Sequence, residues 1–209
     1  DEKHSYIYDY EKQDGYFPFR SENAYNREKK DLKEFFHIYP LWGRYPDFIS
    51  KDTLMLFKTL LVLGSKLLKA IDYYSPIKVK DKYTEALNKM SENNLQNLMR
   101  VIHYPPTRLS DHPNEIRAAA HTDINLITLL VSGSKPGLQV KNKSGKWVNI
   151  ESKKGQLVVN IGDMLQEASS GYFPSTIHRV INPKKLENLS RYSIPLFIHP
   201  RPEVVLSDK

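Results

Sequence analysis

The sequence predicts a mainly β protein with flanking helices. Its 209 residues are 40% apolar and 26% charged, close to the averages of folded globular chains. From about residue 95 onward, short segments rich in β-branched and aromatic residues alternate with turn signals. That rhythm is typical of an antiparallel sandwich or barrel and argues against a parallel βαβ sheet. Before it lies one long segment with helical periodicity, so we expect helices packed against an all-β core.

The first fifty residues are rich in tyrosine and other aromatics, with turn signals at Asp14-Gly15 and Phe17-Pro18. We expect irregular structure there, with only scattered strands. Over residues 51–73, apolar side chains such as Leu54, Phe57 and Leu61 recur at three- and four-residue steps. This predicts an amphipathic helix, for which Ser50 or Asp52 could serve as N-cap.

A second helix is predicted over residues 81–90, and Pro76 prevents the two from forming one continuous rod. The predicted strands are residues 98–104, 117–121, 126–131, 137–140, 147–150, 157–161, 176–181 and 191–198. The chain shows no repeat and no long linker. We therefore expect a single domain over 1–209, with an aromatic-rich and helical N-terminal part (1–94) and a β core (95–200).

Charge and composition exclude several classes of protein. Lys and Arg number 31 against 24 acids, a formal net charge of +7, but the lysines are mostly mixed with acids and no groove-reading motif accompanies them. We do not expect nucleic-acid binding. The absence of cysteine excludes a disulfide scaffold, a thiolate zinc finger, an iron–sulfur cluster and a cysteine nucleophile. No apolar run is long enough to span a membrane and no secretory pattern opens the chain, so we expect a cytoplasmic protein.

Two separate segments carry candidate metal ligands. His121 and Asp123 lie two residues apart, so in a strand both side chains would point to one face. His178 lies in a later strand candidate. Together they would form two neutral nitrogen ligands and one anionic oxygen, the set of non-heme Fe(II) oxygenases. The same set could hold a catalytic zinc ion, and ligand identity alone leaves both open.

A third segment carries a candidate carboxylate clamp. Arg191 and Ser193 share one strand face with Pro195 and Phe197. A guanidinium presents a planar fork of donors that suits a carboxylate, and a charged group beside apolar neighbours implies a partly buried site with an anionic partner.

The order of these elements resembles the isopenicillin N synthase-like branch of the 2-oxoglutarate/Fe(II)-dependent dioxygenases. The likeness runs from about Gly15 to Pro200. The matching segments are Met99-Arg100-Val101-Ile102-His103-Tyr104-Pro105-Pro106, Ala120-His121-Thr122-Asp123, Pro136-Gly137-Leu138-Gln139-Val140, Val159-Asn160-Ile161-Gly162-Asp163, Ser175-Thr176-Ile177-His178-Arg179-Val180 and Arg191-Tyr192-Ser193-Ile194-Pro195. Each segment alone is weak, and their ordered agreement is specific.

The resemblance implies a double-stranded β-helix (jelly-roll) core backed by helices. It implies Fe(II) held by His121, Asp123 and His178. The cosubstrate 2-oxoglutarate would place its distal carboxylate on Arg191 and Ser193, with Tyr104 helping to hold it. With O2, such an enzyme oxidises a small molecule, most commonly by hydroxylation, and releases succinate and CO2. No catalytic residue is expected beyond these ligands.

Two departures and two alternatives accompany the resemblance. The branch normally has a longer segment before the Gly15-Tyr16-Phe17-Pro18 stretch, so we expect that this segment is missing or shortened here. Ile102 stands where plant relatives often carry asparagine.

Some Fe(II) oxidases of the branch keep the Arg-x-Ser pair without using 2-oxoglutarate, and a non-catalytic jelly-roll binding protein is the other alternative. Asn160 and Asp163 are expected to organise a strand end and turn, and Phe197 to lie in the core.

Overall fold

The computed structural model describes residues 2–22, 29–108, 111, 115–151 and 153–207. The strands are β1 (Gly15–Phe17), β2 (Glu34–Ile38), β3 (Leu98–Tyr104), β4 (Ala118–His121), β5 (Ile127–Val131), β6 (Leu138–Lys141), β7 (Trp147–Asn149), β8 (Leu157–Ile161), β9 (His178–Val180) and β10 (Arg191–Ile198). The α-helices are α1 (Asp52–Tyr74), α2 (Ile77–Lys80), α3 (Leu87–Met90) and α4 (Asp163–Ala168), and the 3-10 helices are η1 (Glu2–Tyr6) and η2 (Lys185–Glu187).

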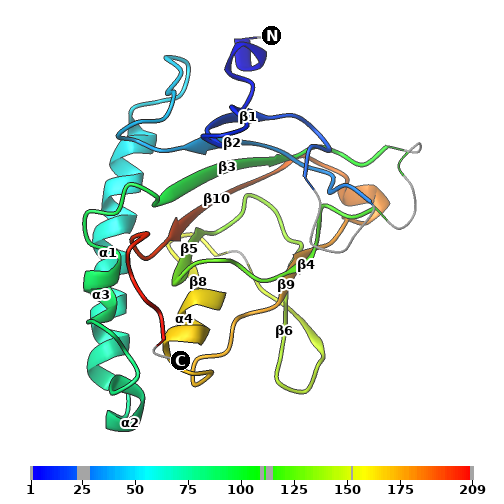
Figure 1. Ribbon diagram of the computed structural model, residues 1–209. Helices are drawn as coiled ribbons and strands as arrows, with labels where there is room; N and C mark the ends of the chain where they lie inside the picture. Colours follow the sequence, from blue (N-terminus) through cyan, green and yellow to red (C-terminus); the bar gives the residue numbers. More distant parts are fainter. Residues whose placement is uncertain (1, 23–28, 109–110, 112–114, 152, 208–209) are drawn as a thin grey trace.

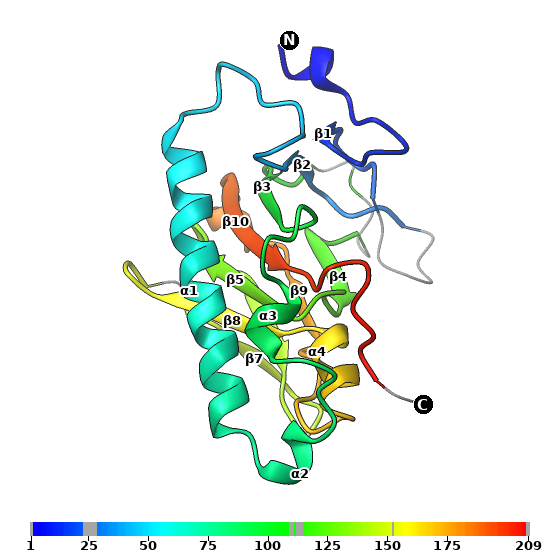
Figure 2. The same cartoon turned by 60° about the vertical axis from the view of Figure 1, so that its left-hand side comes forward.

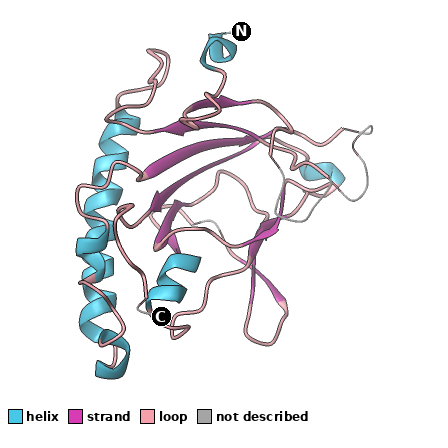
Figure 3. Ribbon diagram, in the orientation of Figure 1, coloured by secondary structure: helices cyan, strands magenta, loops and turns pink. Residues whose placement is uncertain are grey.

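The strands form two antiparallel sheets in a jelly-roll arrangement (Figures 1 and 3). The larger sheet has the order β1-β2-β3-β10-β5-β8, and the smaller has the order β4-β9-β6-β7. Strand β10 runs between β3 and β5, so the last strand of the chain is central in the larger sheet. Side chains from both sheets, among them Ile102, Leu130, Leu138 and Val180, pack together in the interior between them. The fold class expected from the sequence is therefore confirmed.

Helix α1 covers the outer face of the larger sheet (Figure 2). Its buried residues Phe57, Leu60 and Leu68 belong to one apolar cluster with β-strand residues such as Leu129 and Ile198. A Cβ atom at Gly64 would lie 2.0 Å from Ile198 Cδ1, so the helix approaches β10 closely where it has no side chain. Burial of this stripe against the sheet is what stabilises a helix of this length.

The expected helix over residues 51–73 is confirmed, whereas the one over 81–90 is wrong in most of its length. The N-cap of the helix is Lys51, which makes no side-chain capping bond, so the expected N-cap at Ser50 or Asp52 is wrong. Ser50 Oγ accepts a hydrogen bond from the Asp52 N–H at 3.1 Å, one residue before the cap position. Residues 81–86 instead form a turn between α2 and α3. Tertiary contacts hold it: Tyr83 Oη bonds Ser75 Oγ at 2.9 Å, and Arg201 pairs with Glu85 at 2.8 Å. Long-range contacts of this kind override local helix propensity.

The eight predicted strands are all present, and four of them, β4, β5, β7 and β9, are one to three residues shorter than expected. Just before β9 the Thr176 carbonyl accepts a bond from the His178 ring, and just before β4 the Arg117 N–H donates to Asn182 Oδ1. In the described part of the chain, no helix is long and apolar enough to cross a bilayer.

Candidate metal centre

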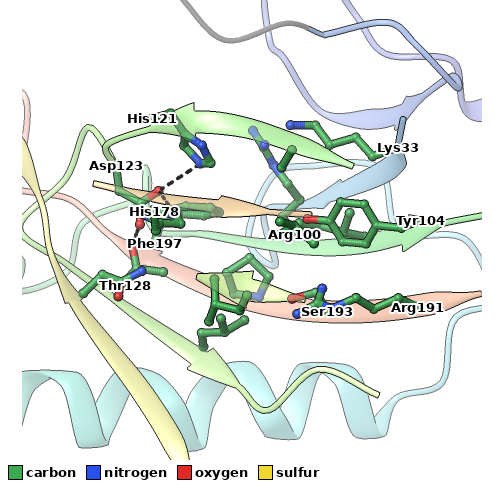
Figure 4. A pocket seen from close by; sticks show the side chains of 17 residues that line it. Lys33, Arg100, Tyr104, His121, Asp123, Thr128, His178, Arg191, Ser193 and Phe197 are labelled. Atoms are coloured by element: carbon green, nitrogen blue, oxygen red, sulfur yellow. Dashed lines mark hydrogen bonds and ion pairs between the residues drawn. The ribbon is translucent and has the colours of Figure 1, made fainter. Parts of the chain in front are cut away.

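Three candidate metal ligands from two strands converge inside the jelly roll (Figure 4). His121 ends β4, Asp123 follows two residues later, and His178 begins β9. The two histidines are register partners in the antiparallel pair of β4 and β9. Asp123 Oδ1 lies 4.0 Å from His121 Nε2 and 3.7 Å from His178 Nε2. All three ligand atoms lie within 4.8 Å of one another, a cluster that could hold a metal ion.

Each imidazole is oriented by the backbone carbonyl two residues before it. His121 Nδ1 lies 2.7 Å from the Ala119 carbonyl oxygen, and His178 Nδ1 lies 2.9 Å from that of Thr176. A carbonyl only accepts, so each Nδ1 carries the proton and each Nε2 turns a lone pair toward Asp123. This is the ring orientation that metal-binding histidines need. Burial, and next the neighbouring His178, lowers the pKa of His121 to about 4, so this ring is neutral at pH 7.

The Asp123 carboxylate is held by a short chain of hydrogen bonds. Thr128 Oγ1 donates to Asp123 Oδ2 at 2.6 Å, and Asn125 Nδ2 donates to Thr128 Oγ1 at 2.7 Å. Oδ1 is thereby left to face the two imidazoles. The Asp163 N–H also donates to the Asp123 backbone oxygen at 2.9 Å. Thr122 Oγ1 donates to Asp163 Oδ2 at 3.0 Å, and this side-chain bond agrees with the expected structural role of Asp163 at this turn.

A buried arginine lies at the other end of the same cavity. Arg191 is only 1% exposed, and its guanidinium lies over the Tyr104 ring at 5.2 Å. Nε donates to the Lys135 carbonyl at 3.0 Å, while the buried Nη1 has no hydrogen-bond partner. No carboxylate among the described residues pairs with it. Burial lowers the pKa of this guanidinium, and a cation so placed requires an anion for compensation.

The Arg191 guanidinium fits in its place because Gly133 lies beside it. A Cβ atom at Gly133 would be 2.4 Å from Arg191 Nη2, so only glycine fits without moving the guanidinium. Ser193 is also buried and lines the same cavity, two residues along β10. Arg191, Ser193, Pro195 and Phe197 all line it, as their shared strand face predicts.

The cavity that joins the two ends measures about 50 Å³. It is lined by Lys33, Arg100, Ile102, Tyr104, Ala118, His121, Asp123, Thr128, Leu130, Leu138, Asn160, His178, Val180, Arg191, Ser193, Pro195 and Phe197. A two-histidine-one-carboxylate set at one end suits Fe(II) with open positions, and an uncompensated guanidinium at the other suits an organic acid. Fold and site together define a metal-binding jelly-roll protein of the oxygenase type.

Sequence reasoning missed several residues of this cavity. Thr128 had a usable signal, since it is a polar residue in the otherwise apolar stretch 126–131. Arg100 shares the two-residue period of Ile102 and Tyr104, so its direction was also readable. Lys33 comes from a loop and had no such signal. Asn160 and Phe197 line the cavity, whereas the expectation placed them in a turn and in the core.

His103, the neighbour of Tyr104, points to the opposite face of β3. Its Nδ1 lies 2.8 Å from Glu34 Oε1 and its Nε2 lies 2.9 Å from Ser190 Oγ. It takes no part in lining the cavity, which agrees with the alternation of a strand.

The family model of the 2OG-Fe(II) oxygenase superfamily matches residues 95–200, just over half of the chain. The chain belongs to this superfamily. The matched residues begin before β3 and end after β10, so they contain both the candidate metal ligands and the arginine clamp.

Individual relatives agree with this assignment. A 2-oxoglutarate-dependent dioxygenase, citB of Monascus ruber, is 37% identical over 114 residues, which cover 53% of this chain and 33% of the relative. A Shewanella oneidensis crystal structure is 46% identical with a TM-score of 0.87, covering 100% of this chain and 74% of that one. A full-length Neurospora crassa protein in complex with alpha-KG is 28% identical with a TM-score of 0.73, covering 95% of this chain and 66% of that one. The chain spans about a third of the length of the curated relatives it matches.

Proposed function

We propose that the protein is an Fe(II)- and 2-oxoglutarate-dependent oxygenase that oxidises a small-molecule substrate by hydroxylation. The observation that supports this best is a single buried cavity with a convergent His-Asp-His set at one end and an arginine without a carboxylate partner at the other. In this proposal His121, Asp123 and His178 hold the ion. Arg191, Ser193 and Tyr104 bind the distal carboxylate of the cosubstrate.

When bound, iron and cosubstrate supply the oxidising power: O2 is consumed, 2-oxoglutarate leaves as succinate and CO2, and one oxygen atom enters the substrate. The residues of the chain hold the ligand side chains in position. Carbonyls fix both imidazoles, and Thr128 fixes the carboxylate, so the ligand set is organised in advance. The guanidinium stays charged and offers a free N–H group to the incoming acid.

The substrate is proposed to enter beside Arg100 and Phe197, which both line the cavity; Phe197 is labelled beside the candidate metal ligand His178 in Figure 4. Arg100 lies over the rings of Phe35 and Phe197 at 4.2 and 5.4 Å. We further propose that the protein acts in the cytoplasm, because a reducing compartment keeps iron in the ferrous state.

The proposal is tested by anaerobic titration of the Fe(II)-loaded protein with 2-oxoglutarate, followed by the weak visible charge-transfer band of the complex. We expect a saturating band for the wild type. Replacing Arg191 with Met removes the charge that pairs with the distal carboxylate, so the Kd for 2-oxoglutarate should rise by about 100-fold or more. Arg179→Met is the matched control, because Arg179 stacks on Trp147 at 4.0 Å and does not line the cavity.

Two outcomes would contradict the proposal. If the wild type fails to bind Fe(II), the metal assignment is wrong. If it binds Fe(II) but not 2-oxoglutarate, the protein is an oxidase of the other type, whose arginine holds a different acid. A Kd equally raised in Arg179→Met would mean that the effect of Arg191 is not local.

A further inference from the structure

A second cavity lies outside the metal centre. The connection between β9 and β10, which forms part of its wall, lies on the side of the molecule opposite α1 (Figure 1). It measures about 830 Å³, within the range of sites for small organic ligands. Its walls come from the β5–β6 loop, the end of β7 with the residues after it, and the connection between β9 and β10. It shares no lining residue with the cavity of the metal centre.

Arg117 lines this cavity as a buried cation. The residue is 1% exposed, and Nη2 donates to the carbonyls of Leu189 and Pro105. The buried Nε has no hydrogen-bond partner, and no described carboxylate pairs with the guanidinium. Arg191 is a second cation in its surroundings, and burial first and Arg191 next lower the pKa of Arg117. A buried guanidinium without a counter-charge is costly, so an anion in the cavity would stabilise it.

The rim of the cavity adds further positive charge. Lys135 and Lys184 are exposed, and neither forms an ion pair within the part of the chain that the structure describes. Lys153 pairs with Glu151 at 3.0 Å, and Glu187 is the other acid on the lining. The basic side chains therefore outnumber the acids, which favours an anionic occupant.

The rest of the wall is mostly apolar, with Asn149 and Asn182 as its uncharged polar residues. Ile150, Ile181, Leu186 and Leu189 line it, together with two prolines. Leu186 is 101% exposed and Leu189 is 55% exposed, so both leucines show apolar surface beside the cations. Apolar walls combined with a few charged groups are typical of a site that binds an organic molecule by its body and orients it by its charge.

We propose that this second cavity binds an amphipathic organic acid. The acid group is held by the positive field of Arg117, Lys135 and Lys184, and the hydrocarbon part packs against Ile150, Leu186 and Leu189. The site is separate from the metal centre and does not depend on the activity proposed for that centre.

The test is a calorimetric titration of the full chain, without metal or 2-oxoglutarate, with octanoate as the probe. Octanoate should bind at one site per chain. Acetate lacks the apolar body and octanamide lacks the charge, so each should bind about tenfold more weakly or worse. Equal binding of octanamide and octanoate would overturn the anionic character of the site, and no binding of octanoate would overturn the site itself.

Variants locate the bound probe. The double charge reversal Lys135→Glu with Lys184→Glu should weaken octanoate binding by about tenfold or more at low salt. Lys143→Glu is the matched control, since Lys143 is exposed on the β6–β7 turn and does not line the cavity. Arg117 is left intact because its bonds to two carbonyls support the fold.

A second titration, made anaerobically with Fe(II) and saturating 2-oxoglutarate present, completes the set, because a carboxylate could also bind at the metal centre. Octanoate affinity unchanged in that titration and in Lys143→Glu, but reduced in the double variant, supports the proposal. Affinity that is unchanged in the double variant, or lost when Fe(II) and 2-oxoglutarate are present, overturns it.

Discussion

Thr128 carries the hydrogen bond that fixes the Asp123 carboxylate, although it is not itself a candidate ligand. Replacing it with Val keeps the shape but leaves both Asp123 Oδ2 and Asn125 Nδ2 without this partner. We expect the affinity for a divalent metal to fall by about 10- to 100-fold, as for other groups that support a ligand. Anaerobic competition with a chelator measures this.

Thr128→Ser keeps the hydroxyl and should restore most of the affinity, which a purely steric role would not explain. Metal binding that is equally strong in Thr128→Val and the wild type would show that Asp123 needs no such support.

His37 is buried outside the metal centre in an ionic cluster. Its Nε2 accepts from Arg100 Nε at 2.8 Å and its Nδ1 bonds the Gln13 carbonyl at 2.6 Å, with Glu22 and Lys33 also nearby. Burial and then the charge of Arg100 lower the pKa of His37 to about 3. The unfolded chain takes up this proton near pH 6.5, whereas the folded chain does so only near pH 3. Stability is therefore fully present above pH 6.5 and is lost as the pH falls between these values.

This histidine should account for about 2 kcal/mol of the stability lost between pH 7 and pH 5. Urea unfolding at both pH values, for the wild type and for His37→Gln, measures the difference. Glutamine keeps an acceptor and a donor but does not titrate. The variant should therefore lose about 2 kcal/mol less stability than the wild type between the two pH values. Parallel losses in the two proteins would show that His37 is not the group responsible.

Helix α1 and strand β10 approach each other closely at Gly64, where the helix has no side chain. Ala is the better helix former, but its Cβ would collide with Ile198 Cδ1, and Ile198 is fully buried. We expect Gly64→Ala to lower the free energy of unfolding by about 1–3 kcal/mol, the cost of overpacking a core. Chemical denaturation provides the measurement.

Ile198→Val removes the colliding methyl and is the test of that cause. The double variant Gly64→Ala with Ile198→Val should lose less stability than the two single losses together. Strict additivity would mean that the alanine acts elsewhere.

Elements were predictable from the sequence where local pattern and tertiary contacts agree. Burial alternates over residues 191–195, and the sequence placed the whole of β10 at 191–198. The turn at 81–86 was not predictable, because the partners of Tyr83 and Glu85 are distant in the sequence or depend on the packing of α1. The candidate ligands were predictable from their order and spacing. Lys33 joins the cavity, and Gly133 meets the Arg191 guanidinium, only through the three-dimensional fold.

At the scale of the whole molecule, we propose that the N-terminal part and the β core form one domain. Strand β2 of the first part pairs with β3 of the second over five residue pairs, and α1 packs on β10 and β5. Each part carries one tryptophan, Trp42 and Trp147. Single-tryptophan variants, with the other replaced by Phe, should therefore report coincident urea transitions. A transition of Trp42 at lower urea than that of Trp147 would contradict this.

The bonds from the two imidazoles to the carbonyls of Ala119 and Thr176 have one more consequence. Each of these bonds spans only two residues of the chain, so the orientation of the rings depends on nearby backbone and not on an ion between them. Exchange of one divalent ion for another should then leave both rings in place. The carboxylate, tied through a rotatable hydroxyl, is the part of the set able to adapt to ions of different radius.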